Sequence, residues 1–516
     1  MLKLEFINIT KWLMTTFKLI LFQLTLIFTT MSCSKVADLN PTSSAPTVEP
    51  SSLIFEVSYD RENSAGFGKA KGTIKLLIEN KPILGATSRL KIETAPSNHS
   101  AIDEKGDGLY GFTITPTRSG EVAVEVSFEG QSRSESLLIF QGLSNSFGQP
   151  LAIKGDVNTD GWEDGAVIHP NGELFFAQYI PIHASAMFNF STFCASSVLC
   201  DWSHPWIKYT HGPVSSPKRP DFFNSRIELD GALAHRFPLF DFDPIYSPPS
   251  SFYGFKRMAD GSFSEPFLIG VDDGNYGGGF GPYGLGLQPI NEIQSRIVFA
   301  WDDPLDAPDT GFDIFTDVIT HGEKNILGIY QRIGGVPTQL NFSPIRLGFP
   351  DHSGVQGNPH LYSDANGLVK SVWVDSENDS DNTNDLTAYI LTDPNTFPSG
   401  PWIKKSLPSK LDTPARGETQ PFFNGKYLYY RGELELLRSE YLGGDFSLET
   451  SWSDPVVVIQ PASIATGNLV AVGEPSIATQ NGKTYLYFIY AIDRGAEAAT
   501  GVRDFDLNAG YVEILE

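Results

Sequence analysis

The chain has 516 residues, of which 41% are hydrophobic and 19% charged, so its composition is globular and its length exceeds one ordinary domain. Its formal net charge is −24. Such acidity argues against nucleic acid as a partner, because binding to phosphates needs clustered Lys and Arg side chains. Alternating apolar segments and turn residues recur, and no capped amphipathic helix follows the first 40 residues. The expected fold class is all-β.

The N-terminal segment has the features of an export signal. Lys11 and Lys18 precede an apolar run over residues 19–28, and small residues follow it up to Cys33. The run is about half of the ~20 residues that a bilayer-spanning helix needs. The pattern predicts a signal peptide over residues 1–32.

The pair Ser32-Cys33 resembles the lipobox of bacterial lipoproteins, although Thr30 stands where Leu is usual. The resemblance implies that Cys33 carries lipid and anchors the protein in a membrane. An ordinary signal peptide with an incidental cysteine is the alternative. Ser34 resembles the sorting position of outer-membrane lipoproteins, which implies the periplasmic face or the cell surface. Residues 33–51 are rich in Ser and Pro and predict a flexible tether.

Two further cysteines, Cys194 and Cys200, lie in one predicted loop. In an oxidising compartment they would form a disulfide that closes a small ring. Two free thiols are the alternative.

Residues 52–142 form the first predicted folded unit. The segment over residues 106–130 alternates with period two across a turn at Ser119-Gly120 and predicts a hairpin. It resembles the closing hairpin of bacterial immunoglobulin-like and filamin-like domains. The resemblance implies an immunoglobulin-like β-sandwich that acts as a spacer, with Tyr110 in its core.

Residues 144–516 carry a degenerate repeat: a polar residue, often followed by Pro, then an apolar strand, a turn with Asn-Gly, and an aromatic strand. The clear copies cover residues 162–179, 357–374, 418–432 and 473–490. A weaker copy begins at Gln288-Pro289, and another is expected to begin at Asp221. The glycine-rich stretch over residues 277–286 is interpreted as a loop between blades.

This repeat resembles that of TolB-type propellers, which are WD40-like, and GFDIF at residues 311–315 resembles a middle strand of that family. The resemblance implies a β-propeller of six blades, with five or seven as alternatives. The architecture is physically reasonable, because each blade has two apolar faces that only neighbouring blades can cover. Two stacked sandwiches are the alternative.

The segment DVNTDGWED supplies alternating oxygen ligands at Asp156, Asn158 and Asp160, with Asp164 four residues further on. Calcium binds six to eight such oxygens on a flexible loop. The spacing resembles the calcium loop of integrin-type propellers, so calcium is one interpretation and a polar entry into the first blade is the other. The acidic stretch over residues 375–385 is a weaker candidate.

Residues just before the first strand of each blade are expected to gather around the mouth of the propeller channel. These positions carry carboxylates and amides, which could bind a cation, a sugar or a basic peptide, or simply line a hydrated funnel. The predicted funnel residues are Glu163, Asp164, Asp221, Gln288, Asn358, Glu418, Gln420 and Glu474.

The leading functional hypothesis is therefore a non-catalytic envelope protein that presents its propeller to a protein or glycan. The alternative is a carbohydrate-active hydrolase, because glycoside hydrolysis uses two carboxylates and Asp164, Glu418 and Glu474 could supply them. No signature of a zinc protease, serine hydrolase or nucleotide-binding loop is present. No cofactor other than calcium is expected.

Overall fold

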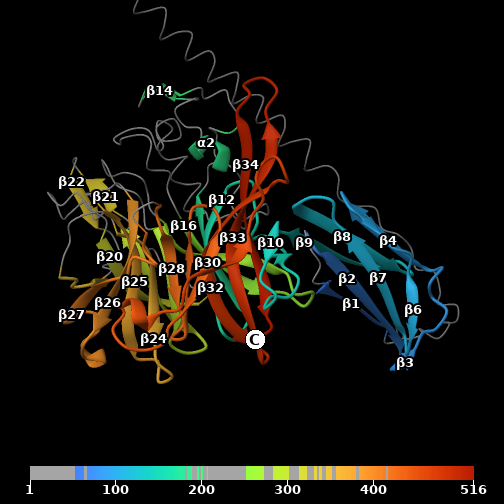
Figure 1. The fold of residues 1–516 in the computed structure, drawn as a ribbon, viewed down its shortest axis with the longest axis horizontal. Helices are drawn as coiled ribbons and strands as arrows, with labels where there is room; N and C mark the ends of the chain where they lie inside the picture. The colour runs from blue at the N-terminus through green and yellow to red at the C-terminus, as the bar shows by residue number, and fades with distance from the viewer. Residues whose placement is uncertain are drawn as a thin grey trace, which may run out of the picture. The chain divides into compact units, whose positions relative to one another are not determined.

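The computed structural model describes residues 53–62, 67–180, 183–188, 194–196, 199–200, 206, 251–271, 283–301, 313–321, 330–333, 336–339, 345–350, 356–378, 383–413 and 416–516. Strands dominate these residues, as the all-β prediction requires (Figure 1). Among the described residues no helix is both long enough and apolar enough to cross a membrane. Cys33 and Asp221 lie outside the described residues, so the lipid anchor and the blade expected at Asp221 stay predictions.

The N-terminal domain is a β-sandwich. One sheet has the order β1 (Leu53–Glu62), β2 (Lys69–Ile78), β7 (Leu109–Thr115) and β5 (Asn98–His99), with β3 (Lys81–Pro82) beside β2 and β6 (Asp103–Gly106) beside β7. The facing strands are β4 (Leu90–Ala95), β8 (Gly120–Phe128) and β9 (Gln131–Ile139). Their inward side chains share one core. Tyr110 is fully buried there, as predicted, and its hydroxyl donates to the carbonyl of Ile83 at 2.8 Å.

The hairpin predicted across Ser119-Gly120 is wrong. β7 pairs with β2, whereas β8 pairs with β4 and β9, so the chain crosses from one sheet to the other at this turn. The tight hairpin lies one strand later, between β8 and β9. Glu129 (φ 48°) and Gly130 (φ 83°) occupy its two central positions, and two left-handed residues are what a two-residue type I′ turn requires.

Most strands of the second domain fall into five blades that follow one another along the chain (Figure 1). Pairing between strands joins the first and fifth blades to one sheet of the sandwich, in an 11-stranded sheet. The first blade contains β12 (Trp162–Ile168), β13 (Leu174–Ile180), β16 (Ser251–Arg257) and β17 (Phe263–Val271). The second contains β18 (Tyr283–Pro289), β19 (Gln294–Trp301), β20 (Asp313–Thr320) and β23 (Ile345–Arg346). The residues of the predicted GFDIF strand that are described belong to β20, in the middle of its blade.

The third blade contains β24 (Gln356–Ser363), β25 (Val369–Asn378), β26 (Thr383–Leu391) and β27 (Trp402–Ser406). The fourth contains β28 (Thr419–Phe423), β29 (Tyr427–Arg431), β30 (Leu436–Glu440) and β31 (Val456–Gln460). The fifth contains β32 (Leu469–Gln480), β33 (Lys483–Ala496) and β34 (Arg503–Ile514). The fourth and fifth blades each gain one short strand from the segment that precedes the first blade. In the fourth blade β10 (Gly142–Leu143) pairs with β31, and in the fifth β11 (Leu151–Ala152) pairs with β34.

The five blades close into a ring. Each inner strand, β12, β18, β24, β28 and β32, contacts the inner strands of both neighbouring blades, and β32 contacts β12. Each pair of neighbouring blades also shares one apolar core. The described residues therefore form a five-bladed propeller, which was one of the alternatives, rather than the six blades favoured by the sequence. The inner strands of the first and second blades, β12 and β18, are in direct contact, so the five described blades complete the ring.

The glycine-rich stretch and Gln288-Pro289 were misplaced by the sequence interpretation. Tyr283 begins the inner strand β18, and Gln288-Pro289 ends this strand rather than beginning it. Glycine is needed in β18 because a Cβ atom at Gly284 would lie 2.7 Å from Cα of Asn358 in the next blade. The end of the glycine-rich stretch is thus an inner strand packed closely against its neighbour.

Two short strands, β14 (Cys194–Ser196) and β15 (Leu199–Cys200), pair with Cys194 directly opposite Cys200. Residues directly opposite in an antiparallel pair have Cα separations that a disulfide can bridge. The backbone register is compatible with the predicted disulfide, which stays a prediction.

Candidate functional site at the propeller axis

Every inner strand of the propeller carries a β-bulge at the same relative position. The bulges interrupt the pairing of β12, β18, β24, β28 and β32 with the second strand of each blade. At each bulge one residue adopts a positive φ, from 44° to 64°. These residues are Gly165, Gly284, Asn358, Gln420 and Glu474. The bulges turn side chains of five separate segments toward the axis of the ring.

Side chains of one blade hold the bulge of the next. Oε1 of Gln178 in β13 accepts the backbone N–H of Gly284 at 2.9 Å. Oδ2 of Asp375 in β25 accepts the N–H of Gln420 at 2.8 Å, and Oε1 of Gln420 accepts the N–H of Glu474 at 3.0 Å. These bonds satisfy backbone donors that the bulges remove from the strand ladders, and they fix the geometry of the axis.

Asp164 from the first blade and Glu474 from the fifth bring their carboxyl groups within hydrogen-bonding reach of each other. Two carboxyl groups can share a hydrogen bond only when one of them is protonated. Both side chains are half-buried and keep some contact with solvent. Desolvation raises the pKa of Asp164 to about 6, and desolvation together with the charges of Asp164 and Asp375 raises the pKa of Glu474 well above its usual range.

A third carboxyl group, that of Asp375, lies near this pair and interacts electrostatically with both members. Its Oδ2 accepts Nδ2 of Asn358 at 2.7 Å as well as the N–H of Gln420. Burial raises the pKa of Asp375, whereas these two donors and the positive charge of Arg431 oppose the rise. The axis therefore gathers three acids from three blades and one cationic side chain from a fourth.

The space between the inner strands at the bulges is small. It measures about 20 Å³ and is lined by the axial residues Asn358, Gln420 and Glu474 together with Leu285, His360 and Phe422. The ring of His360 lies 3.8 Å from that of Phe422, and burial lowers the pKa of His360 to about 3, so this imidazole is neutral near pH 7.

The structure brings some of the predicted funnel residues together and separates others. Asp164, Asn358, Gln420 and Glu474 meet at the axis, as the preceding contacts show. Gln288 lies at the far end of its inner strand, where its Nε2 donates to the carbonyl of Gly367 at 2.7 Å.

Glu163 and Glu418 belong to separate local networks. Glu418 is fully buried, forms an ion pair with Arg416 at 2.8 Å and accepts the N–H of Thr413 at 3.0 Å. Glu163 accepts the N–H of Thr159 at 3.0 Å. Both carboxylates thus hold the loop that leads into their blade.

Two of the four predicted calcium residues, Asn158 and Asp164, are engaged with other partners. The amide of Asn158 donates to the carbonyls of Ile153 and Ala509 at 3.2 and 3.1 Å, and its oxygen accepts the N–H of Ala509 at 2.7 Å. Asp164 faces Glu474 at the axis. Among the described residues no group of three or more His, Cys, Asp or Glu side chains is arranged to hold a metal ion.

Three axial residues were missed by the sequence analysis: Gln178, Asp375 and Arg431. A signal for them exists in the repeat. Each is paired with the residue at or just before a bulge, namely Asp164 with Gln178, Gly357 with Asp375, and Thr419 with Arg431. In these blades, axial side chains therefore come from two places: the bulge of the inner strand, and the residue of the second strand that pairs with it.

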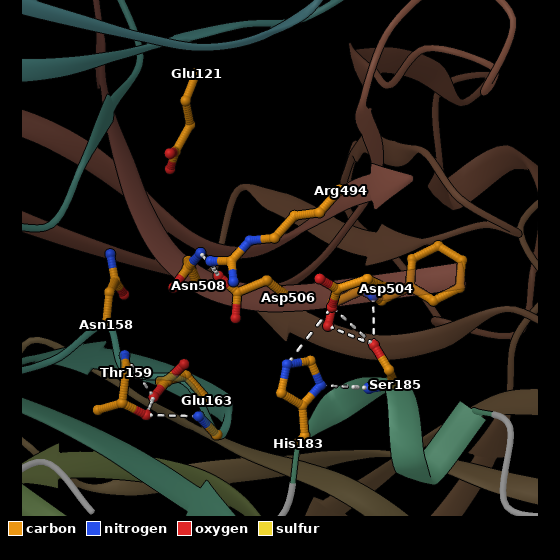
Figure 2. Close-up of polar contacts among 12 residues, drawn as sticks. Glu121, Asn158, Thr159, Glu163, His183, Ser185, Arg494, Asp504, Asp506 and Asn508 are labelled. Atoms are coloured by element: carbon orange, nitrogen blue, oxygen red, sulfur yellow. Dashed lines mark hydrogen bonds and ion pairs between the residues drawn. The ribbon is translucent and has the colours of Figure 1, made fainter. Parts of the chain in front are cut away.

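A Ser–His–Asp grouping beside α2 (Ala184–Phe188) does not have the geometry of a catalytic triad (Figure 2). Oγ of Ser185 contacts Oδ1 of Asp504 at 3.2 Å and donates to the carbonyl of Phe505 at 3.0 Å. Nδ1 of His183 accepts the backbone N–H of Ser185 at 3.2 Å. A triad requires the histidine to accept the serine hydroxyl, so these contacts instead cap and dock the short helix.

Comparisons with known proteins identify no family. No family model matches the sequence, and no curated protein matches it. Solved structures of similar fold include a family 117 glycoside hydrolase from the marine bacterium Zobellia galactanivorans, at 9% identity and a TM-score of 0.31, covering 71% of this chain and 90% of that one. An α-L-arabinanase from Cellvibrio cellulosa, complexed with arabinohexaose, has 12% identity and a TM-score of 0.27, covering 50% and 87%.

The WD40 domain of SCAP from fission yeast has 10% identity and a TM-score of 0.25, covering 69% of this chain and 68% of that one. All of these identities and TM-scores are low. They do not determine the activity of this chain, whose function is inferred from its own site.

Proposed function

We propose that the protein is a carbohydrate-active hydrolase whose acids lie at the propeller axis. The supporting observation is the close approach of the carboxyl groups of Asp164 and Glu474, where burial and the charge of Asp164 raise the pKa of Glu474 well above its usual range. This reverses the order of the two hypotheses drawn from the sequence, in which non-catalytic binding came first. Of the three acids suggested there, Asp164 and Glu474 are retained, Glu418 is replaced by Asp375, and the reaction class is unchanged.

Glycoside hydrolysis needs a neutral acid that protonates the leaving oxygen and an ionised carboxylate that acts as base or nucleophile. Glu474 has the stronger rise in pKa and is assigned the proton donor. Asp375 is assigned the ionised role, because Asn358, Gln420 and Arg431 all favour its charged form. Environments that differ in this way are how one site keeps two carboxyl groups in different protonation states.

The amides and the guanidinium at the axis suit a sugar ligand. Asn358 and Gln420 supply both donors and acceptors, and Arg431 is half-buried beside them. Hydroxyl groups of a glycan can exchange hydrogen bonds with all three side chains.

The test is a screen for release of reducing ends from bacterial, algal and plant polysaccharides. Glu474→Gln and Asp375→Asn are expected to lower turnover by about 10²- to 10⁴-fold, which is the usual contribution of a positioned acid or base. Glu173→Gln is the matched control, because Glu173 is exposed in the β12–β13 turn. Retention of full activity by Glu474→Gln would rule out the assignment. Polysaccharide binding by the wild type without any release of reducing ends would favour the binding hypothesis instead.

We also propose that the protein is exported and held in the outer membrane by lipid on Cys33. The support is the lipobox-like sequence. Metabolic labelling with palmitate should mark the wild type and not Cys33→Ala, and label on the variant would contradict the proposal.

A further inference from the structure

Four turns of the propeller carry the sequence Asn-Gly, and each of them joins the inner strand of its blade to the second strand. They are Asn171-Gly172, Asn366-Gly367, Asn424-Gly425 and Asn481-Gly482, in the first, third, fourth and fifth blades. Asn-Gly suits tight turns because both residues adopt left-handed backbone angles at low cost. The same pair also undergoes a spontaneous backbone reaction more readily than other Asn pairs, because glycine has no side chain to shield its backbone nitrogen.

The reaction is the deamidation of asparagine through a cyclic imide. The backbone nitrogen of the glycine loses its proton to water or hydroxide and forms a bond with Cγ of the asparagine, whose side-chain nitrogen leaves as ammonia. Water then opens the imide at either of its carbonyls, which gives aspartate or isoaspartate and adds one negative charge. The step needs a free asparagine amide, an accessible glycine N–H and a turn that can change its dihedral angles.

The turn of the first blade is held at both reacting groups. Oδ1 of Asn171 accepts the N–H of Glu173 at 3.0 Å, and the N–H of Gly172 donates to the carbonyl of His169 at 2.8 Å. Gly172 is also buried, and a Cβ atom there would lie 2.9 Å from Oε1 of Gln480 in the fifth blade. The imide cannot form here until these contacts are broken.

The turns of the fourth and third blades are each held at one reacting group. Oδ1 of Asn424 accepts the N–H groups of Lys426 and Tyr427 at 3.0 and 2.7 Å, so the asparagine amide is fixed. In the third blade the N–H of Gly367 donates to the carbonyl of Asp364 at 2.9 Å, so the attacking nitrogen is occupied.

The turn of the fifth blade is held at neither group. The strand pairing closes at Gln480 and Lys483, and Asn481 (φ 51°) and Gly482 (φ 77°) form a two-residue type I′ turn between them. Both turn residues are exposed. Within the described ranges, neither the side chain of Asn481 nor the N–H of Gly482 has a hydrogen bond. No atom of the described residues beyond the chain neighbours would lie within 4 Å of a Cβ atom on Gly482, so the turn has room to rearrange.

We propose that Asn481 is a site of spontaneous deamidation to aspartate and isoaspartate, and that the fold protects the other three Asn-Gly pairs. Each hydrogen bond that must break before the imide forms slows the reaction by about fivefold. Isoaspartate lengthens the backbone by one carbon between β32 and β33, and β32 carries Glu474. The proposal needs none of the chemistry of the axial acids and is independent of the hydrolase proposal.

The test is incubation of the full chain, purified in detergent, in mildly alkaline buffer, with peptide mass spectrometry of the four pairs at successive times. Deamidation at Asn481 should be at least about fivefold faster than at Asn366, and faster still relative to Asn171 and Asn424. The Asn481 peptide should contain both aspartate and isoaspartate, because the imide opens at either carbonyl.

The same chain in concentrated guanidinium chloride is the control, because the folded contacts are absent and the four pairs should react at similar rates. Asn481→Gln, whose folding is checked by thermal melting, should remove the fastest gain of negative charge seen by ion exchange and leave the other three sites unchanged. A rate at Asn481 in the folded protein no higher than at another pair would overturn the proposal. So would the same order of rates in denaturant, because the order would then arise from local sequence and not from the fold.

Discussion

Oε1 of Gln420 accepts the backbone N–H of Glu474 at 3.0 Å across the boundary between the fourth and fifth blades. The same Gln420 donates its own N–H to Asp375 of the third blade at 2.8 Å. One residue therefore links three blades and positions two of the three axial acids. The links between these blades and the positions of two axial acids therefore depend on the same residue.

Gln420→Leu should remove the acceptor while keeping much of the side-chain volume. The N–H of Glu474 would then lose its partner, at a cost of about 1–3 kcal/mol in the free energy of unfolding. Urea denaturation measures this change. Gln131→Leu, at an exposed turn of the sandwich, is the control and should change stability little. Equal stabilities for the two variants would show that the link across the blades is unimportant.

Gly284→Ala should be among the most damaging small substitutions in the propeller. Gly284 has φ 64°, and an added Cβ would approach Cα of Asn358 to 2.7 Å. Strain at the left-handed backbone and the clash between blades both oppose folding. A drop in melting temperature of several degrees is expected. Gly367→Ala, at a positive-φ turn with open space around it, separates the two causes because it retains only the backbone strain.

The stability of the protein should decline as pH rises through about 6. Burial raises the pKa of Asp506 from its usual 3.8 to about 6, so between these values the folded state binds more protons than the unfolded state. Protonation of this group therefore stabilises the fold at low pH, and the gain is lost as pH rises through the folded pKa. In the wild type, the free energy of unfolding should fall between about pH 4 and about pH 7. In Asp506→Asn this fall should be smaller by on the order of 2 kcal/mol. Parallel pH profiles would contradict the shift.

The calcium proposal has a separate test. With Asn158 and Asp164 bound to other groups, the proposal depends most on Asp156 and Asp160. EGTA should lower the melting temperature of the wild type, and Asp160→Ala should abolish the difference. Identical melting curves with and without EGTA would remove calcium from the account.

The repeat predicted the propeller but not its number of blades. Four copies of the strand–turn–strand pattern are visible because their apolar strands and Asn-Gly turns follow local rules of side-chain alternation and φ. The second blade lacks the pattern at its start, since Gly284 and Leu285 stand where other blades have a polar residue followed by Pro, as in Asn358-Pro359. Close packing of Gly284 and Gly286 against Asn358 and Pro359 demands glycine at both positions, and such a contact between blades has no local signature.

Half of the axial site followed from the sequence and half did not. Asp164 and Glu474 were identified because they stand in the entry motif of their strands. Glu163 and Glu418 occupy the same motif, yet each is turned into its own loop by Thr159 or by Arg416. Asp375 was assigned to an acidic loop, although it is a buried residue of a strand. Which side of a strand a side chain takes at a bulge depends on tertiary pairing that composition does not reveal.

The most direct measurement is the infrared absorption of protonated carboxyl groups, recorded for the folded protein near pH 7. The account predicts a protonated-carboxyl band in the wild type that weakens in Glu474→Gln and titrates away only at higher pH. The band should be unaffected by Glu173→Gln. If the spectrum of Glu474→Gln shows the same protonated-carboxyl band as that of the wild type, the axial pair holds no proton. Glu474 would then not be the proposed acid.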